Sequence, residues 1–284
     1  MSDIKHYLSL VKFSHTIFAL PFACIGFTLA LREGYSFSLQ QLLLVILCMV
    51  TARNAAMAFN RYIDRHFDLL NPRTAVREIP AGIIKSKNAV FFILVNCALF
   101  ILSTYFINPI CFYLSPVALF VVLFYSYTKR FTPLCHLVLG CGLALAPIGA
   151  YLAVTGHFSW LPLLFSFTVF CWVSGFDIIY ALQDETFDRD HQLNSIPVLL
   201  GTKGALHFSE ILHVFAIAFV IAAGFVGHFN FLYWIGTMVF TGLIVYQHTI
   251  VKPHDLSRVN LAFGTTNGIA SVVFATFTIV SFYL

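Results

Sequence analysis

The chain has 284 residues, of which 60% are hydrophobic, 17% aromatic and only 10% charged, and its mean hydropathy is +0.88. Soluble domains carry about 25% charged residues, so this composition excludes an ordinary soluble core. The formal net charge of +4 gives no indication of a nucleic-acid partner. The seven cysteines lie in or beside apolar runs and never form Cys-x-x-Cys, so we interpret them as small packing residues.

Apolar runs near 20 residues long follow one another along the chain. About 20 helical residues cross a hydrocarbon layer of roughly 30 Å, and these runs lack the alternation of barrel strands. The first run has no small-x-small exit, so we expect it to stay as a helix. The sequence predicts an all-α polytopic membrane protein with nine spans, near 14 to 32, 39 to 62, 88 to 107, 110 to 128, 133 to 153, 159 to 181, 206 to 227, 229 to 250 and 259 to 283.

The basic residues indicate the orientation of these spans. If the N-terminus is cytoplasmic, every Lys and Arg except Arg32 lies on or near the cytoplasmic side. Positive residues are enriched in cytoplasmic loops, so we predict a cytoplasmic N-terminus and an outer C-terminus. Two long polar loops, about 64 to 87 and 183 to 203, then face the cytoplasm. We expect the active site on that side, in an integral protein of a bacterial inner membrane.

Two clusters of oxygen ligands lie at the cytoplasmic ends of predicted spans. Members spaced four residues apart share one face of a helix. The first cluster is Asn60, Asp64 and Asp68, and the second is Asp184 and Asp188, with Asp177 two turns earlier. Carboxylate and amide oxygens without His or Cys favour Mg²⁺, which is commonly held by one or two carboxylates and substrate phosphates. One such cluster could be explained by carboxylates that only keep a helix end hydrated. Two clusters at matching positions on the same side of the membrane are not explained in this way.

Basic residues near these clusters fit a diphosphate. Arg53 precedes Asn60 by two helical turns at a depth where an unpaired charge is costly. Lys129 closes a span on the same side, and Arg73 and Arg77 follow the first cluster. We predict that these four residues bind diphosphate. Other basic residues are interpreted as membrane anchors: Arg65, Lys85, Lys87 and Arg130.

The motifs together resemble the UbiA superfamily of intramembrane aromatic prenyltransferases. The matching text begins with Ala52-Arg53-Asn-Ala-Ala-Met57, Asn60-x-x-x-Asp64-x-x-x-Asp68, Asn71-Pro-Arg-Thr74 and Pro80-x-Gly82. It continues with Tyr125-Ser-Tyr-Thr-Lys-Arg130, Gly175-Phe-Asp-Ile-Ile-Tyr-Ala-Leu-Gln-Asp184-x-x-x-Asp188 and Ser195-Ile-Pro197. Many relatives have Asn-Asp where this chain has Asn60-Arg61. The motif sequences of this chain are similar to those of the 4-hydroxybenzoate polyprenyltransferase branch.

The resemblance implies one domain over residues 1–284, with nine membrane helices around a central cavity that opens laterally to lipid. It also implies Mg²⁺ and diphosphate at four residues, with Asp68 completing the first motif: Asn60, Asp64, Asp184 and Asp188. The reaction would move a polyprenyl group from its diphosphate to an aromatic acid such as 4-hydroxybenzoate, for quinone biosynthesis. Its catalytic residues would be Asp64, Asp184, Lys129 and Arg53.

The acceptor half of the site is less defined by sequence. Aromatic faces stabilise an allylic cation, and our candidates near the acceptor are Tyr125, Tyr127, Asp177 and Tyr180. The 4-hydroxybenzoate polyprenyltransferase branch is similar to enzymes that act on 1,4-dihydroxy-6-naphthoate in menaquinone synthesis. The acceptor can therefore be either a benzoate or a naphthoate. A CDP-alcohol phosphotransferase would need Asp-Gly before Ala-Arg, which the chain lacks, and an ion-coupled transporter would place its acids near the bilayer centre.

Overall fold

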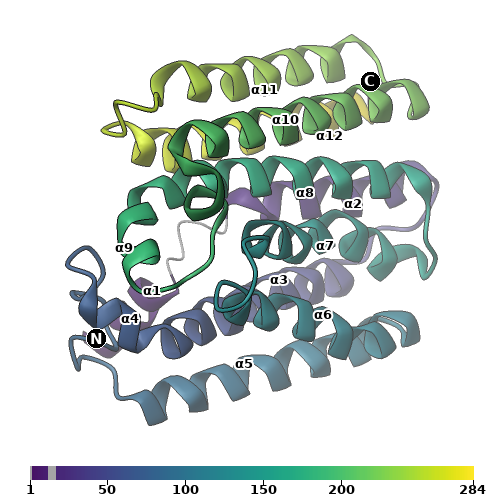
Figure 1. Ribbon diagram of the computed structural model, residues 1–284. Coiled ribbons are helices and arrows are strands. Elements are labelled where there is room, and N and C mark those ends of the chain that lie inside the picture. The colour runs from purple at the N-terminus through teal and green to yellow at the C-terminus, as the bar shows by residue number, and fades with distance from the viewer. Residues whose placement is uncertain (1, 12–16) are drawn as a thin grey trace.

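A computed structural model describes residues 2–11 and 17–284, and these ranges are helical apart from turns and one isolated bridge between Lys252 and Asp255 (Figure 1). The α-helices are α1 (Ser2–Leu10), α2 (Leu20–Arg32), α3 (Leu39–Ile63), α4 (Arg65–Leu70), α5 (Ser86–Ile107), α6 (Pro109–Thr128), α7 (Cys135–Thr155), α8 (Trp160–Ala181), α9 (Glu185–Asp190), α10 (Ile196–Val226), α11 (Phe231–Ile250) and α12 (Asn267–Ser281). A 3-10 turn, Leu182–Asp184, links α8 to α9, and a π-helical turn, Leu261–Thr266, precedes α12. The fold is therefore all-α, as predicted.

Seven helical segments in the described ranges are long and apolar enough to cross a membrane. They contain α3, α5, α6, α7, α8, α10 and α12. The other two predicted spans correspond to α2, a 13-residue apolar helix, and to the 20-residue α11. Residues 14 to 16 of the first predicted span lie outside the described residues.

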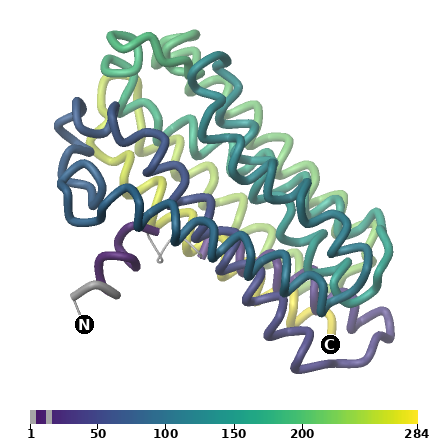
Figure 2. Tube along the Cα trace, turned by 90° about the horizontal axis from the view of Figure 1, so that it is seen from below, coloured from purple at the N-terminus to yellow at the C-terminus, as the bar shows by residue number. Residues whose placement is uncertain are grey.

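The long helices run side by side, and the short helices gather at one end of the bundle. Figure 1 shows α4 and α9 together at the end where the N-terminus lies, which we call the motif end. The C-terminus lies at the opposite end in both views (Figures 1 and 2). The two polar loops that the sequence indicates therefore meet at the motif end.

Local sequence signals set the helix boundaries. The side chains of Asn108 and Ser195 cap α6 and α10 by accepting hydrogen bonds from backbone N–H groups of the first turn, and Pro follows each cap within two residues. Gly156 ends α7 in the left-handed conformation that glycine tolerates best. Gly201, with φ of +67°, interrupts the helical conformation within α10, so a short helical stretch from Ile196 precedes the part of the helix that the sequence predicts from 206.

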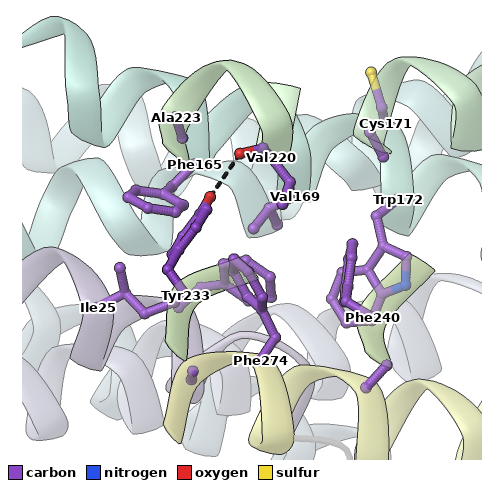
Figure 3. Packing of buried hydrophobic residues seen from close by; sticks show 14 of the residues in the cluster. Ile25, Phe165, Val169, Cys171, Trp172, Val220, Ala223, Tyr233, Phe240 and Phe274 are labelled. Carbon is purple, nitrogen blue, oxygen red and sulfur yellow. Dashed lines mark hydrogen bonds between the residues drawn. The ribbon is translucent and has the colours of Figure 1, made fainter. Parts of the chain in front are cut away.

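An aromatic core surrounds α8. Trp172 on α8 is fully buried among Phe22, Phe240 and Phe274 of three other helices. The hydroxyl of buried Tyr233 donates to the Val220 carbonyl at 2.6 Å (Figure 3). Because α8 packs against both α7 and α10, its end that carries the second motif is held firmly at the motif end of the bundle.

Candidate functional site

Both acidic motifs straddle a helix break. Asp64 joins α3 to α4 with φ −86° and ψ 0°, and Asp184 joins the 3-10 turn to α9 with φ −107° and ψ 2°. This sparsely populated region of backbone space recurs at active sites. Neither carboxylate caps the short helix that follows it. α3 ends at Ile63 and α8 at Ala181, but the spacing of four residues is kept through the first motif, because the backbone N–H of Asp64 donates to the Asn60 carbonyl and that of Asp68 to the Asp64 carbonyl.

Asp64 is the most heavily partnered of the motif carboxylates. Lys129 Nζ lies 2.8 Å from Asp64 Oδ2, and Arg130 Nη2 donates to Oδ1 at 2.9 Å. Asn60 Nδ2 also donates to Oδ2 at 3.2 Å. Only 3% of Asp64 is exposed, so its charge depends on these partners. The end of α6 thus meets the end of α3 through one buried carboxylate.

The second aspartate of the first motif is paired with a predicted diphosphate residue. Arg77 Nη1 donates to Asp68 Oδ1 at 2.6 Å. Asp68 is buried, and its other oxygen, Oδ2, has no hydrogen-bond partner. A buried carboxylate oxygen without a donor is costly, and it is the kind of atom that a cation would satisfy.

The loop after the first motif reaches across to the second. Arg73 makes a bidentate pair with Asp184, and its Nη1 donates to the Tyr180 hydroxyl at 3.0 Å. Asn71 Nδ2 donates to Asp184 Oδ1 at 3.2 Å. Burial lowers the pKa of Arg73, but Asp184 and Tyr180 outweigh this effect and hold it above its ordinary value. Arg73 therefore remains a cation next to the second motif.

The two motifs are also close enough for their charges to act on each other. Asp188 interacts electrostatically with Lys129, Asp184 and Asp64. The backbone N–H of Asn194 donates to the Lys129 carbonyl at 2.6 Å, which joins the second polar loop to the end of α6. The structure therefore brings together the motif carboxylates and three of the four predicted diphosphate residues: Lys129, Arg73 and Arg77.

An apolar cavity of about 370 Å³ lies between α3, α5, α6 and α7. Among the described residues that line it, Arg53 is the one charged side chain. The hydroxyls of Thr104 and Ser115 in its wall donate to carbonyls of their own helices, so the wall is effectively hydrocarbon. Arg53 thus lies in the wall of this cavity, whereas the ion pairs of Asp64, Asp68 and Asp184 are made by Lys129, Arg130, Arg77 and Arg73.

The acceptor candidates separate into two groups. Tyr125 lines the cavity beside Arg53 and interacts electrostatically with Asp64 and Asp177. Tyr180 is tied to Arg73. In contrast, Tyr127 is 40% exposed and packs against Phe59. The geometry therefore joins Tyr125, Asp177 and Tyr180 to the site, whereas, among the described residues, Tyr127 contacts it only through the guanidinium of Arg130, which lies 5.5 Å from the centre of its ring.

Three site residues escaped prediction from the sequence. Arg130 was interpreted as an anchor, yet it binds Asp64 and the carbonyls of Ile63 and Ser126. Asn71 begins the Asn-Pro-Arg-Thr motif, which was a usable signal. His136 Nδ1 donates to Asp177 at 2.7 Å, and nothing in the sequence pattern indicated this pair.

The donor set fits a hard divalent cation. It consists of the Asn60 amide oxygen and carboxylates, with an unpartnered oxygen on Asp68. Within residues 2–11 and 17–284, no three His, Cys, Asp or Glu side chains converge as a complete metal cage. Mg²⁺ is commonly bound by one or two carboxylates together with substrate phosphates, so two separate carboxylate pairs suit it.

The fold and site together define a polytopic membrane protein with paired acidic motifs beside an apolar cavity. The sequence pattern of the UbiA prenyltransferase family matches residues 19–277, and the chain belongs to that family. Curated relatives include 4-hydroxybenzoate octaprenyltransferases of Francisella tularensis subsp. novicida, 30% identical over 155 residues, and of Tolumonas auensis, 31% identical over 174 residues. These matches span 55% and 61% of the chain and 55% and 60% of the relatives.

Solved structures agree with this assignment. A UbiA homolog from Aeropyrum pernix K1 is 34% identical, with a TM-score of 0.85 over 94% of this chain and 97% of that one. A UbiA homolog from Archaeoglobus fulgidus, solved with DMAPP and Mg²⁺, is 19% identical, with a TM-score of 0.77 over 98% and 99%. The second likeness shows the fold alone. The family match favours the prenyltransferase hypothesis over a phosphotransferase or a transporter.

Proposed function

We propose that this protein transfers a polyprenyl group from polyprenyl diphosphate to an aromatic acid such as 4-hydroxybenzoate, and releases diphosphate. The proposal rests on the arrangement of side chains at the motif end. There, two acidic motifs pair with Lys129, Arg73 and Arg77, close to Tyr125 in the wall of an apolar cavity. A charged head group and a hydrocarbon tail need such neighbouring environments.

The residues that would hold Mg²⁺ are Asn60, Asp64, Asp68, Asp184 and Asp188. When bound, the metal would neutralise charge on diphosphate as a Lewis acid. The Archaeoglobus fulgidus homolog, solved with DMAPP and Mg²⁺, supports this ligand pair. Asp68 Oδ2, buried without a donor, supports it from this chain's own side chains.

The basic residues would stabilise the leaving group. Lys129, Arg73 and Arg77 each form an ion pair with a motif carboxylate. If a metal cation bound that carboxylate instead, the basic side chain could pair with a diphosphate oxygen. As the allylic C–O bond breaks, its electron pair stays on diphosphate, where these fixed positive charges lower the barrier. A ring carbon ortho to the acceptor hydroxyl then bonds the allylic carbon, and loss of the ring proton restores aromaticity.

Arg53 would serve the acceptor side of this reaction. Its place in an apolar wall beside Tyr125 suits the carboxylate of an aromatic acid better than the diphosphate expected from the sequence. Tyr125 and Tyr180 offer aromatic faces near the two motifs, and the hydrocarbon wall excludes water from the cation. Tyr127, which is 40% exposed and lies against Arg130, is our weakest acceptor candidate.

The membrane arrangement completes the proposal. We infer a single domain with nine spans, of which α2 and α11 are the two beyond the seven candidates, and a cytoplasmic N-terminus. The motif end then faces the cytoplasm, where diphosphate and Mg²⁺ are soluble. A bacterial inner membrane, with its lipid as solvent for the polyprenyl tail, is the compartment that this chemistry suits.

Product mass spectrometry tests the proposal. Purified protein would receive a polyprenyl diphosphate, Mg²⁺, and 4-hydroxybenzoate and 1,4-dihydroxy-6-naphthoate in competition. We expect one prenylated aromatic product and stoichiometric diphosphate, and the product's mass identifies the acceptor. If wild type and the Asp64→Ala variant release the same small amount of diphosphate from every allylic donor, prenyl transfer is the wrong function.

A further inference from the structure

A buried histidine and an aspartate form a hydrogen-bonded pair beside the cavity. His136 Nδ1 lies 2.7 Å from Asp177 Oδ2, and the His136 and Asp177 side chains are 5% and 21% exposed. His136 lies one turn before Leu139, and Leu143 follows at the next turn on that face of α7. Both leucines line the cavity. The pair therefore sits at the turn where the lined face of α7 begins.

The contact fixes the carboxylate of Asp177. A carboxylate accepts hydrogen bonds, so the ring nitrogen must be the donor. The other ring nitrogen, Nε2, is buried without a hydrogen-bond partner, so the contact from Nδ1 to Asp177 orients the ring. A charge among apolar helices is costly without a partner. His136 thus holds one oxygen of Asp177 in place, while the side chain keeps part of its surface open.

Groups of opposite charge lie around one hydroxyl at this end of the cavity. Tyr125 interacts electrostatically with Asp177 and with Arg53, and Arg53 and Tyr125 both line the cavity. An aromatic acid carries a carboxylate at one end and a hydroxyl donor at the other. A cation in the cavity wall and a carboxylate next to that wall can bind those two ends at once.

We propose that His136 is a positioning residue, which holds Asp177 so that its free oxygen accepts a hydrogen bond from the hydroxyl of the aromatic acceptor. This inference rests on the proposed function. The bond would orient the ring, so that the carbon ortho to the hydroxyl faces the allylic carbon. It would also enrich that carbon in electrons, because a hydroxyl that donates to a carboxylate gains phenolate character.

The test compares acceptors that differ only in this hydrogen bond. Each variant receives a polyprenyl diphosphate with 4-hydroxybenzoate or 1,4-dihydroxy-6-naphthoate as substrate. The corresponding O-methyl compounds, 4-methoxybenzoate and 1,4-dimethoxy-6-naphthoate, serve as competitive inhibitors. In wild type we expect the hydroxyl compound to bind at least tenfold more tightly, the size of a hydrogen bond to a charged group.

The variants His136→Ala and Asp177→Asn should raise the KM for the acceptor about tenfold and remove most of the preference for hydroxyl over methoxy. The KM for the donor should stay unchanged. His136→Gln, which keeps a donor for Asp177, should retain part of the preference. His207→Ala is the matched control, because His207 pairs with Glu210 on an exposed face of α10, and it should behave as wild type.

Two results would overturn the inference. One is an unchanged hydroxyl preference in Asp177→Asn, and the other is an equal loss of donor and acceptor binding in His136→Gln and Asp177→Asn, as a merely structural pair would give. If wild type prenylates neither acceptor, the proposed function itself has failed, and the inference fails with it. Wild-type turnover with no change of preference in the variants refutes the inference alone.

Discussion

Replacement of Lys129 by Met separates catalysis from folding. Lys129 lies 2.8 Å from Asp64, but Asp64 also keeps Arg130 at 2.9 Å and Asn60 at 3.2 Å. The buried carboxylate therefore stays paired in Lys129→Met. We expect a loss of about 1 kcal/mol in stability or less, which lowers Tm by a few degrees at most.

The effect on turnover should be much larger. One fixed positive charge aimed at a leaving group is typically worth about 10² to 10³ in kcat. Arg130→Met is the matched variant, since Arg130 holds the carbonyls of Ile63 and Ser126 as well as Asp64. Its loss removes the side-chain donor of both carbonyls and one of the partners of Asp64, and should destabilise the protein by roughly 2 to 4 kcal/mol.

The assay measures diphosphate release at saturating Mg²⁺, with thermal unfolding in detergent alongside it. Lys129→Met should unfold near the wild-type temperature but release diphosphate at least a hundredfold more slowly, and Lys129→Arg should recover part of the rate. Arg130→Met should show the greater loss of stability. Activity of Lys129→Met within threefold of wild type would refute our view that this residue stabilises the leaving group.

Three further predictions follow from the same contacts. Asp184→Ala should abolish turnover yet insert normally, whereas Asp190→Ala, at an exposed site on α9, should keep it; near-normal rates in both would make Asp184 structural. Gly26→Val should lower Tm sharply, because a Cβ there would lie 2.0 Å from the Pro147 carbonyl oxygen, whereas Gly242→Val, where a Cβ meets nothing within 4 Å, should not. In calorimetry, inorganic diphosphate should bind at least tenfold more tightly with Mg²⁺ than without it, and equal affinities would contradict metal binding at the motifs.

The sequence predicts the long helices well because their signal is simple. The spans near 39 to 62 and 159 to 181 match α3 and α8 within one residue at each end, since hydrophobic runs end where polar residues begin. Periodicity could not reveal the breaks at Asp64 and Asp184, because motifs spaced four residues apart look continuous in sequence. The early start of α10 was missed for a related reason, as Gly201 permits a bend that the apolar pattern does not record.

The site divides in a similar way. The acidic and basic residues could be named from their types and from their side of the membrane. Which base meets which acid could not be, since Arg73 and Asp184 are 111 residues apart and meet only through the fold. Arg53 shows the limit most clearly, because the periodicity that aligns it with Asn60 says nothing of its apolar neighbours in the cavity wall.

The paired charges suggest how the proposed site would bind a highly charged substrate within a membrane protein. Asp64 and Asp68 are buried, and each is compensated by a base. Diphosphate alone would draw the bases away and leave carboxylates without partners, while Mg²⁺ alone would leave the bases without theirs. If both bind, Mg²⁺ would pair with the carboxylates and diphosphate with the bases, so no buried charge is left uncompensated. Metal and diphosphate should therefore bind cooperatively, and each must strengthen the other by the same factor.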